Sequence, residues 1–294
     1  AKNIEKMCGV KIIDRSGLIL DIFAKHARTR EARTQVELAQ LKYNLPRLVE
    51  KDTGLSRLTG GIGGRGPGET KLEIGRRRIR DRIAFLEKKI DQLSAQRQMR
   101  RTRREEQKIP LVSLIGYTNA GKSSVFNALT KSTVFVENKL FATLDPAQRR
   151  LVLPYEGAPG ELVHLVLADT VGFIRDLPVE LSNAFRATLE EIRGANLLLH
   201  VLDASERELA KRKASVEAIL RQMGLDHLPV FLLLNKCDQL SNEKREQLQI
   251  EMPDGFFISA TKREGLNILR EEIERVLKEA GLSKPLRVVG GEDM

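Results

Sequence analysis

Residues 116–123 have the spacing that most clearly predicts chemistry in this sequence. They read GYTNAGKS and fit the pattern G-x-x-x-x-G-K-[ST], between the apolar run LVSLI and the helical stretch SSVFNALT. The glycines let backbone N–H groups face a phosphate at a helix N-terminus, where the helix dipole also favours an anion. In such a loop Lys122 supplies a positive charge to the phosphates and the Ser123 hydroxyl binds Mg²⁺. The predicted phosphate-binding residues are Gly116, Tyr117, Thr118, Asn119, Ala120, Gly121, Lys122, Ser123 and Ser124.

A second motif indicates which base the nucleotide carries. Residues 235–238 (NKCD) directly follow the apolar run VFLLL and resemble the N-K-x-D motif with which P-loop GTPases of the translation-factor class read guanine. There the Asp238 carboxylate would accept hydrogen bonds from the ring N–H and the exocyclic amine of guanine, whereas adenine would leave it unpaired. Ser259 and Ala260, which end FFISA, resemble the loop that supports the base by backbone contact. We therefore expect GTP and GDP as ligands, with Asn235, Lys236, Asp238, Ser259 and Ala260 on the base side, and we interpret Cys237 as a permissive position rather than a nucleophile.

Two further segments predict a sensor of the γ-phosphate. Residues 169–172 (DTVG) resemble D-x-x-G, in which Asp169 holds Mg²⁺ through a water and the Gly172 N–H contacts the γ-phosphate. Thr143, in FATLD, resembles the threonine that binds Mg²⁺ only in the triphosphate state, although a threonine in a surface turn is the alternative. Loss of the γ-phosphate would release both segments. The predicted contacts here are Phe141, Ala142, Thr143, Leu144, Asp145, Asp169, Thr170, Val171 and Gly172; the catalytic candidates are Lys122, Thr143 and Gly172, and the metal ligands are Ser123, Thr143 and Asp169.

The residue after Gly172 departs from the common GTPase pattern. Many GTPases have Gln there to orient the attacking water, whereas this sequence has Phe173, whose ring cannot make that hydrogen bond. We expect very slow hydrolysis by the chain alone, with the missing group supplied by a partner or an ion, since a group supplied in trans can accelerate hydrolysis by about 10³–10⁵-fold. Asn119 resembles the asparagine of potassium-stimulated GTPases, which makes K⁺ a candidate beside Mg²⁺; a structural role in tightening the loop is the alternative.

Positive charge is concentrated in the first third of the chain. Residues 1–108 hold 27 Lys and Arg against 14 Asp and Glu, a net charge of +13, whereas the whole chain has a net charge of +10. This asymmetry predicts a nucleic-acid-binding segment joined to a near-neutral domain, with acidic proteins and membrane surfaces as alternative partners. With 4% aromatic residues and no Trp, phosphate contact and recognition of RNA shape fit better than base stacking. The densest runs are Arg76, Arg77, Arg78, Arg80 and Arg82, then Arg97, Arg100, Arg101, Arg103 and Arg104.

Hydrophobic spacing predicts mainly helices in the basic segment. Residues 10–24 read as two short apolar segments around a Ser16-Gly17 turn. Residues 34–48 read as a helix that its proline kinks or ends, and residues 72–93 as a second helix with a narrow apolar stripe suited to one partner helix. Seven glycines lie between them within 54–68. We predict an antiparallel helical hairpin with a glycine-rich tip loop, for which a flexible linker is the alternative.

The pattern changes at Ile109, where six strand-like runs begin to alternate with helical stretches. This alternation predicts an α/β fold with a mostly parallel sheet and helices on both faces. Pro110 and the charged run before it mark the boundary, and the last residues, SKPLRVVGGEDM, show no pattern. The expected organisation is therefore a partial α/β segment with the basic hairpin at 1–108, a nucleotide-binding domain at 109–281 and a tail at 282–294.

Composition excludes several classes of protein. Hydrophobic residues make up 41% and charged residues 31%, which excludes wholesale disorder. No apolar run approaches the roughly 18 residues of a membrane span, and the first residues lack the apolar stretch of a secretory signal. Two cysteines are too few for a disulfide framework. We expect a monomeric cytoplasmic protein and, because Ala1 stands where an initiator Met would be expected, a processed or excised piece.

Taken together, these motifs resemble the HflX family of ribosome-associated GTPases. The resemblance rests on IDRSGLILDIFAKHARTREARTQVELAQL, on GGIGGRGPGETKLE, and on VSLIGYTNAGKSSVFNAL followed by LFATLDP and LADTVGFIRDLP. It implies GTP hydrolysis, binding to the large ribosomal subunit and its rRNA, and the splitting of stalled or idle ribosomes under stress. It also implies that the glycine loop reaches toward the peptidyl-transferase centre and that Arg65, with Arg76, Arg77 and Arg78, contacts rRNA. Most of the family's first subdomain and its C-terminal domain are expected to be missing.

Other functions fit the same motifs. A ribosome-assembly or tRNA-modifying GTPase would bind a free precursor RNA instead of the mature subunit. A regulatory switch would bind a protein effector and use hydrolysis as a timer. ATP-driven RNA remodelling conflicts with the N-K-x-D motif.

Overall fold

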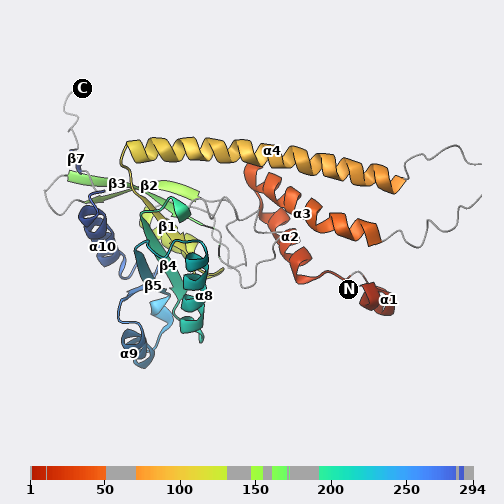
Figure 1. Cartoon of the computed structure of the whole chain (residues 1–294). Helices are drawn as coiled ribbons and strands as arrows, with labels where there is room; N and C mark the ends of the chain where they lie inside the picture. The colour runs from red at the N-terminus through yellow and green to blue at the C-terminus, as the bar shows by residue number, and fades with distance from the viewer. Residues whose placement is uncertain are drawn as a thin grey trace, which may run out of the picture. The chain divides into compact units, whose positions relative to one another are not determined.

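The computed structural model describes residues 2–10, 12–50, 71–130, 147–154, 161–170, 172, 192–282 and 285–287. The described residues form two compact units, one within Ala1–Arg97 and the other within Gln98–Met294. Helix α4, Lys71–Glu106, continues from the first range into the second (Figure 1). No helix in the described part of the chain is long and apolar enough to cross a membrane. The predicted boundary at 108/109 stays a prediction.

In the part of the chain that the structure describes, the first unit is built from helices, whereas the sequence predicts a partial α/β segment there. They are α1 (Lys2–Cys8), α2 (Arg15–His26), α3 (Arg30–Glu50) and the larger part of α4. On α4 the apolar stripe predicted from the sequence packs against α3, where Leu38 contacts the cluster of Leu86 and Ile90. Ion pairs of Arg97 with Glu31 and of Lys42 with Glu87 show that the two helices run antiparallel. This confirms the antiparallel helix pair, while the glycine stretch at 54–68 lies outside the described residues.

The turn predicted at Ser16-Gly17 is wrong. Both residues lie in the first turn of α2, and the Asp14 carboxylate caps this helix by accepting a hydrogen bond from the Gly17 N–H at 2.8 Å. An N-cap of this kind satisfies a backbone donor that the helix leaves open, so the local preference of Ser-Gly for a turn is overridden. Pro46 likewise stands inside α3 without ending it.

The strands of the second unit are β1 (Leu111–Ile115), β2 (Ala147–Pro154), β3 (Glu161–Asp169), β4 (Leu197–Asp203), β5 (Val230–Asn235), β6 (Gly255–Ile258) and β7 (Pro285–Arg287). In the part of the chain that the structure describes, they form a seven-stranded sheet in the order β2-β3-β1-β4-β5-β6, with β7 also paired to β3. β2 and β7 run antiparallel to β3, and the other pairs are parallel. The strand β7 corrects the expectation that the last residues carry no structure, because its three residues pair with the start of β3.

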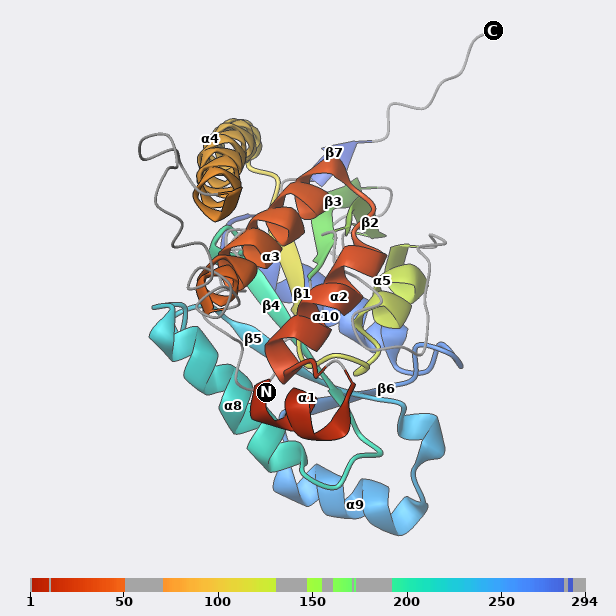
Figure 2. The ribbon, with the colours of Figure 1, turned by 90° about the vertical axis from the view of Figure 1, so that its right-hand side faces the viewer.

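Helices cover both faces of this sheet, as predicted. Side chains of α5 (Lys122–Thr130) and α10 (Leu266–Glu279) share one apolar cluster with Leu199 and Val201 of β4. The alternate residue Leu198 faces the opposite side, where α8 (Leu209–Gln222) packs. The helix α9 (Asn242–Glu251) joins a cluster with Leu202 and Leu234. Figure 2 shows the sheet between these two layers of helices.

The sheet brings the ends of its parallel strands to one edge. In the register, Asp169 at the end of β3 lies opposite Leu114 of β1. Asp203 at the end of β4 lies opposite Asn235 at the end of β5. Ligands of open α/β sheets bind outside the carboxyl ends of the strands, so this edge is where a site is expected.

His200 is a buried ionisable residue within β4. Its side chain is 1% exposed, and its Nε2 has no hydrogen-bond partner among the described residues. Burial lowers the pKa of His200 to about 4, and the positive charges of Lys213 and Lys122 act in the same direction. The imidazole is therefore neutral in the folded protein at neutral pH.

This burial predicts a pH-dependent loss of stability. The unfolded state binds a proton near pH 6.5 and the folded state only near pH 4, so the free energy of unfolding should fall as the pH drops through this window. At 1.36 kcal/mol for each pKa unit, the loss is about 3 kcal/mol. His200→Leu should remove this loss, whereas His227→Asn, at an exposed histidine, should retain it. Urea unfolding at several pH values from 7 to 4 measures the free energy of unfolding. If it falls as steeply with pH in His200→Leu as in the parent, the assignment of this loss to His200 is contradicted.

Candidate nucleotide-binding site

The phosphate loop of residues 116–121 joins β1 to α5 and needs glycine at both ends. Gly116 has φ +140°, and a Cβ there would collide with the Val201 carbonyl oxygen. Gly121 has φ +92°, and a Cβ there would collide with the side-chain nitrogen of Asn235. Both positions combine a backbone conformation that L-residues rarely adopt with a close neighbour, so the loop can take this path only with glycine.

Lys122 is the charged residue of the loop. Its side chain is buried, at 6% exposed, and its Nζ donates a hydrogen bond of 2.7 Å to the Tyr117 carbonyl oxygen. Burial lowers the pKa of Lys122 to about 8, and the negative charge of Asp169 opposes that shift. An ammonium group in such surroundings gains much from an anion, because Coulomb attraction strengthens where water is excluded.

Ser123 and Asp169 meet beside the loop. The Ser123 hydroxyl donates a hydrogen bond of 2.6 Å to the Asp169 carboxylate, which is fully buried. Hydroxyl and carboxylate oxygens are ligands that Mg²⁺ prefers, and Mg²⁺ is commonly held by one or two protein oxygens together with phosphates. The pair therefore fits Mg²⁺. Thr143, the third predicted ligand, and its neighbours at 141–145 lie outside the described residues.

The segment after β3 approaches the phosphate loop closely. The Thr170 hydroxyl donates to the Leu114 carbonyl oxygen at 2.5 Å. A Cβ on Gly172 would stand 2.8 Å from the Thr118 nitrogen and 2.9 Å from the Lys122 Nζ. Glycine at 172 therefore allows this segment to lie against the loop, while Val171 and Phe173 lie outside the described residues.

This approach predicts the effect of Gly172→Ala. The added methyl group would push the segment away from the loop, so the contact predicted between the Gly172 N–H and a γ-phosphate would be lost. We expect affinity for a non-hydrolysable GTP analogue to fall about 10-fold, the cost of one charge-assisted hydrogen bond, with GDP affinity unchanged. Gly75→Ala is the control, because nothing lies within 4 Å of its Cβ position. Calorimetric titration with the GTP analogue and with GDP measures both affinities. Equal losses of affinity for the two nucleotides would contradict a role of Gly172 in contacting the γ-phosphate.

Asn235 connects the loop to the predicted base-binding side. Its side chain is 2% exposed; the Nδ2 donates to the Ala120 carbonyl oxygen at 3.0 Å, and the Oδ1 accepts from the Ala260 N–H at 3.2 Å. Ser259 is buried, and its hydroxyl accepts a hydrogen bond from the Lys262 N–H at 3.0 Å. One amide therefore holds together three segments that are far apart in the sequence.

Asp238 and Cys237 follow on the short 3-10 helix η1 (Cys237–Gln239). Asp238 is exposed, so its carboxylate is accessible to a base. Cys237 is buried, and burial raises the pKa of its thiol to about 11. A thiol that stays protonated is a weak nucleophile, in keeping with the interpretation of Cys237 as a permissive position.

Comparison with known proteins identifies the family. Family models described as "GTP-binding GTPase N-terminal", "GTP-binding GTPase Middle Region" and "50S ribosome-binding GTPase" match residues 1–24, 26–104 and 111–236. GTPase HflX of Flavobacterium psychrophilum is 42% identical, over 96% of this chain and 72% of that protein. The chain belongs to the HflX family. GTPase HflX of Caldanaerobacter subterraneus is 51% identical over 94% of this chain, which spans 62% of that relative.

A solved structure of another GTP-binding protein has a similar fold. A GTP-binding protein from Sulfolobus solfataricus, in complex with GDP, matches this HflX-family chain with a TM-score of 0.55 and 28% identity. The match covers 95% of this chain and 76% of that protein. This supports the interpretation of the sheet and its helices as a P-loop GTPase fold.

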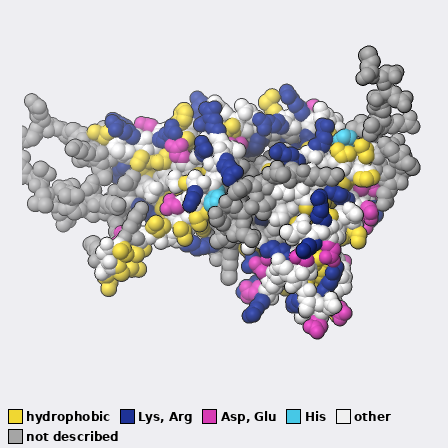
Figure 3. All heavy atoms as spheres, turned by 180° about the vertical axis from the view of Figure 1, so that it is seen from behind, with side chains coloured by type: hydrophobic (Ala, Val, Ile, Leu, Met, Phe, Trp, Pro, Cys, Tyr) yellow, Lys and Arg dark blue, Asp and Glu magenta, His cyan; other side chains and the backbone are white. Residues whose placement is uncertain are grey.

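The HflX-family chain also carries a basic surface on α4. Figure 3 shows Lys and Arg side chains gathered along this helix. Of the predicted RNA-binding residues, Arg77 and Arg78 are exposed and Arg76 is half-buried, while Arg65 lies outside the described residues. Arg80 is exposed one turn further on. All four arginines lie near the start of α4, and we call this arginine-rich stretch, which can meet phosphates, the α4 arginine surface (Arg76, Arg77, Arg78 and Arg80).

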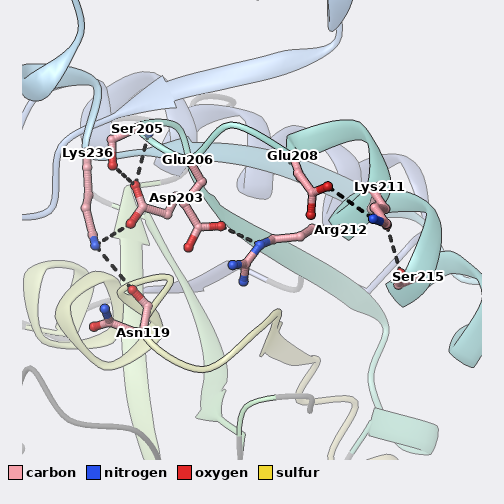
Figure 4. A network of polar contacts seen from close by, with 9 residues as sticks. All are labelled: Asn119, Asp203, Ser205, Glu206, Glu208, Lys211, Arg212, Ser215 and Lys236. Carbon is pink, nitrogen blue, oxygen red and sulfur yellow. Dashed lines mark hydrogen bonds and ion pairs between the residues drawn. The ribbon is translucent and has the colours of Figure 1, made fainter. Parts of the chain in front are cut away.

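The sequence interpretation missed Asp203, a buried residue of the site. Its carboxylate forms an ion pair with Lys236 of the N-K-x-D motif, and Lys236 in turn bonds the phosphate loop (Figure 4). A signal was present in the sequence, since Asp203 ends the apolar run LLLHVLD just as Asp169 ends LVLAD. A carboxylate at the end of a buried parallel strand indicates a site residue.

Proposed function

We propose that this chain binds GTP with Mg²⁺ and hydrolyses it to GDP and phosphate. The observation that supports this best is the buried Asn235 amide, which ties the phosphate loop to the Ser259–Ala260 segment as a guanine-nucleotide site requires. The meeting of Ser123 with Asp169 beside the same loop adds a place for Mg²⁺. Both arrangements come from motifs far apart in sequence, so chance spacing in one motif does not explain them.

Each residue has a defined role in the proposal. Lys122 would leave the Tyr117 carbonyl and bond the β- and γ-phosphates, and the Gly172 N–H would contact the γ-phosphate. Ser123 and Thr143 would bind Mg²⁺ directly, and Asp169 through a water. Mg²⁺ bound there would neutralise charge on the β- and γ-phosphate oxygens. The remaining proposed contacts are the loop N–H groups for phosphate and Asp238 for guanine.

Activation by a partner follows from Phe173. Because its ring cannot orient water, hydrolysis by the chain alone should be slow, and a group from the partner or K⁺ near Asn119 would complete the site. GTP turnover, measured alone and with large ribosomal subunits in potassium and then sodium buffer, tests this. A rise of 10³-fold or more with subunits is within the range of groups supplied in trans. No rise with a full-length relative would contradict the ribosome as activator.

We further propose that the α4 arginine surface docks the protein on rRNA of the large ribosomal subunit. The concentration of positive charge on α4 supports this proposal. The description "50S ribosome-binding GTPase" of the family model that matches residues 111–236 supports it as well. Splitting of stalled ribosomes under stress is the finer part of the proposal, and a GTP-locked full-length form should then separate the subunits in a sucrose gradient. Subunits that stay joined would contradict splitting and leave docking or ribosome assembly as the function.

Docking on RNA predicts a steep dependence of affinity on salt. Reversing Arg76, Arg77 and Arg78 to Glu should weaken subunit binding at least about 10-fold and flatten the salt slope by about one unit for each lost phosphate contact. Reversal of Arg221, Lys244 and Arg275 in the second unit is the control for net charge. Co-sedimentation with subunits between 50 and 300 mM KCl, which spans the range where about 10³–10⁵-fold losses occur, measures both. Equal effects of the two triple variants would indicate a protein partner or unspecific charge.

A further inference from the structure

The turn after β4 holds a buried ion pair that the proposed roles do not use. Asp203 is 7% exposed. Its Oδ1 accepts hydrogen bonds from the Ser205 N–H at 3.0 Å and the Ser205 hydroxyl at 2.6 Å, and its Oδ2 accepts from the Lys236 Nζ at 2.5 Å (Figure 4). The two carboxylate oxygens therefore have separate tasks: one caps the turn and the other holds the lysine.

Lys236 extends this pair to the phosphate loop. The residue has φ +64°, a left-handed conformation uncommon for a lysine, directly after β5. Its Nζ also donates to the Asn119 carbonyl oxygen at 3.2 Å. Parallel pairing of β4 with β5 places Asp203 opposite Asn235, so the backbone register itself sets the carboxylate beside Lys236.

Two of the three N–H donors of the Lys236 ammonium bond oxygens of the described residues, which leaves a third for a ligand. A lysine side chain is otherwise a flexible stem, and its ordering opposes binding. A buried carboxylate that already holds this stem against the loop removes that cost before the nucleotide arrives. A buried ion pair adds little to stability by itself, because desolvation offsets the attraction.

We infer that Asp203 is a positioning residue for guanine-nucleotide binding, acting by holding Lys236 against the phosphate loop at Asn119. This rests on the proposed function, since it assigns Asp203 to the affinity of that same site. The competing interpretation is that Asp203 only caps the turn through Ser205. The two interpretations predict opposite results for two variants of neighbouring residues.

Asp203→Asn keeps an oxygen for Ser205 but removes the negative charge that faces Lys236. Ser205→Ala removes the hydroxyl that donates to the Asp203 carboxylate but keeps the ion pair between Asp203 and Lys236. Glu208→Gln is the charge control, because Glu208 is exposed at the start of α8 and pairs with Lys211, at 3.1 Å, rather than with Lys236. Asp203→Ser, which also removes the charge, serves as a second form should the Asn variant not fold.

The experiment measures the Kd of fluorescent GDP with Mg²⁺, the turnover of saturating GTP, and the apo melting temperature. We expect Asp203→Asn to raise the Kd about 10-fold with turnover at saturation changed less than 2-fold, while Ser205→Ala and Glu208→Gln stay within 2-fold of the parent. In a Lys236→Met background, Asp203→Asn should have no further effect on the Kd, since the group that it positions is gone.

An unchanged Kd in Asp203→Asn and Asp203→Ser would overturn the inference. So would an Asp203→Asn change that raises the Kd as much in the Lys236→Met background as in the parent. A larger loss in Ser205→Ala than in Asp203→Asn would assign Asp203 to the turn. Failure of the unmodified chain to bind GDP would instead contradict the proposed function itself, and the inference with it.

Discussion

Replacing Asp238 by asparagine is expected to exchange the preferred base from guanine to xanthine. The carboxylate would accept two N–H bonds from guanine, and hydrogen bonds to a charged group contribute about 1.5–3 kcal/mol each. GDP affinity should therefore fall about 10²–10⁴-fold. In xanthine a carbonyl oxygen replaces the exocyclic amine; it would repel a carboxylate but accept a bond from the asparagine amide.

The control is Asp254→Asn, the same change at an exposed aspartate just before β6. Competition of GDP and xanthosine diphosphate against a fluorescent guanine nucleotide measures the exchange. A lower affinity for GDP without a higher affinity for xanthosine diphosphate would show that Asp238 maintains the η1 segment rather than reads the base. Equal GDP affinity in Asp238→Asn and the parent would place the base elsewhere.

Replacing Lys122 by methionine is expected to separate nucleotide binding from stability. Methionine has nearly the length of lysine but no charge, so the phosphates lose their ammonium partner, and GTP turnover should fall by more than about 10²-fold. The buried ammonium costs desolvation in the nucleotide-free protein, as its lowered pKa indicates. The melting temperature of the nucleotide-free variant should therefore equal or exceed that of the parent.

Lys278→Met, at an exposed lysine of α10, is the matched control and should change neither quantity. Single-turnover hydrolysis and differential scanning fluorimetry, both on the same preparations, measure the two effects. A variant that melts well below the parent would contradict this account of Lys122, because it would show that the ammonium stabilises the empty loop.

The sequence predicts the architecture of the nucleotide-binding domain because the signals for its strands and helices are local and repeated. The apolar run VFLLL ends at Asn235, and the apolar run LVLA ends at Asp169. Parallel strands bring such polar ends to one edge of the sheet. The structure accordingly places Ser123 beside Asp169 and Asn235 beside Ala120. Nucleotide binding by these residues stays a prediction.

Other features depend on contacts that no local pattern records. The pairing of Asp203 with Lys236 needs the register of β4 on β5 and a left-handed backbone at Lys236. At Ser16-Gly17 the turn preference is real, but a cap from Asp14 makes helix the better alternative. The strand β7 is too short for periodicity and forms only because β3 offers an open edge.

The measurement that tests the central claim most directly is nucleotide competition on the unmodified chain. Fluorescent GDP is bound with Mg²⁺ and then displaced with GDP, GTP or ATP. The account predicts displacement by GDP and GTP at similar concentrations and none by ATP at about 10³-fold higher concentration, because the Asp238 carboxylate would be left unpaired by adenine. Displacement by ATP at the same concentration as GTP, or no binding of GDP at all, would contradict a guanine-nucleotide site.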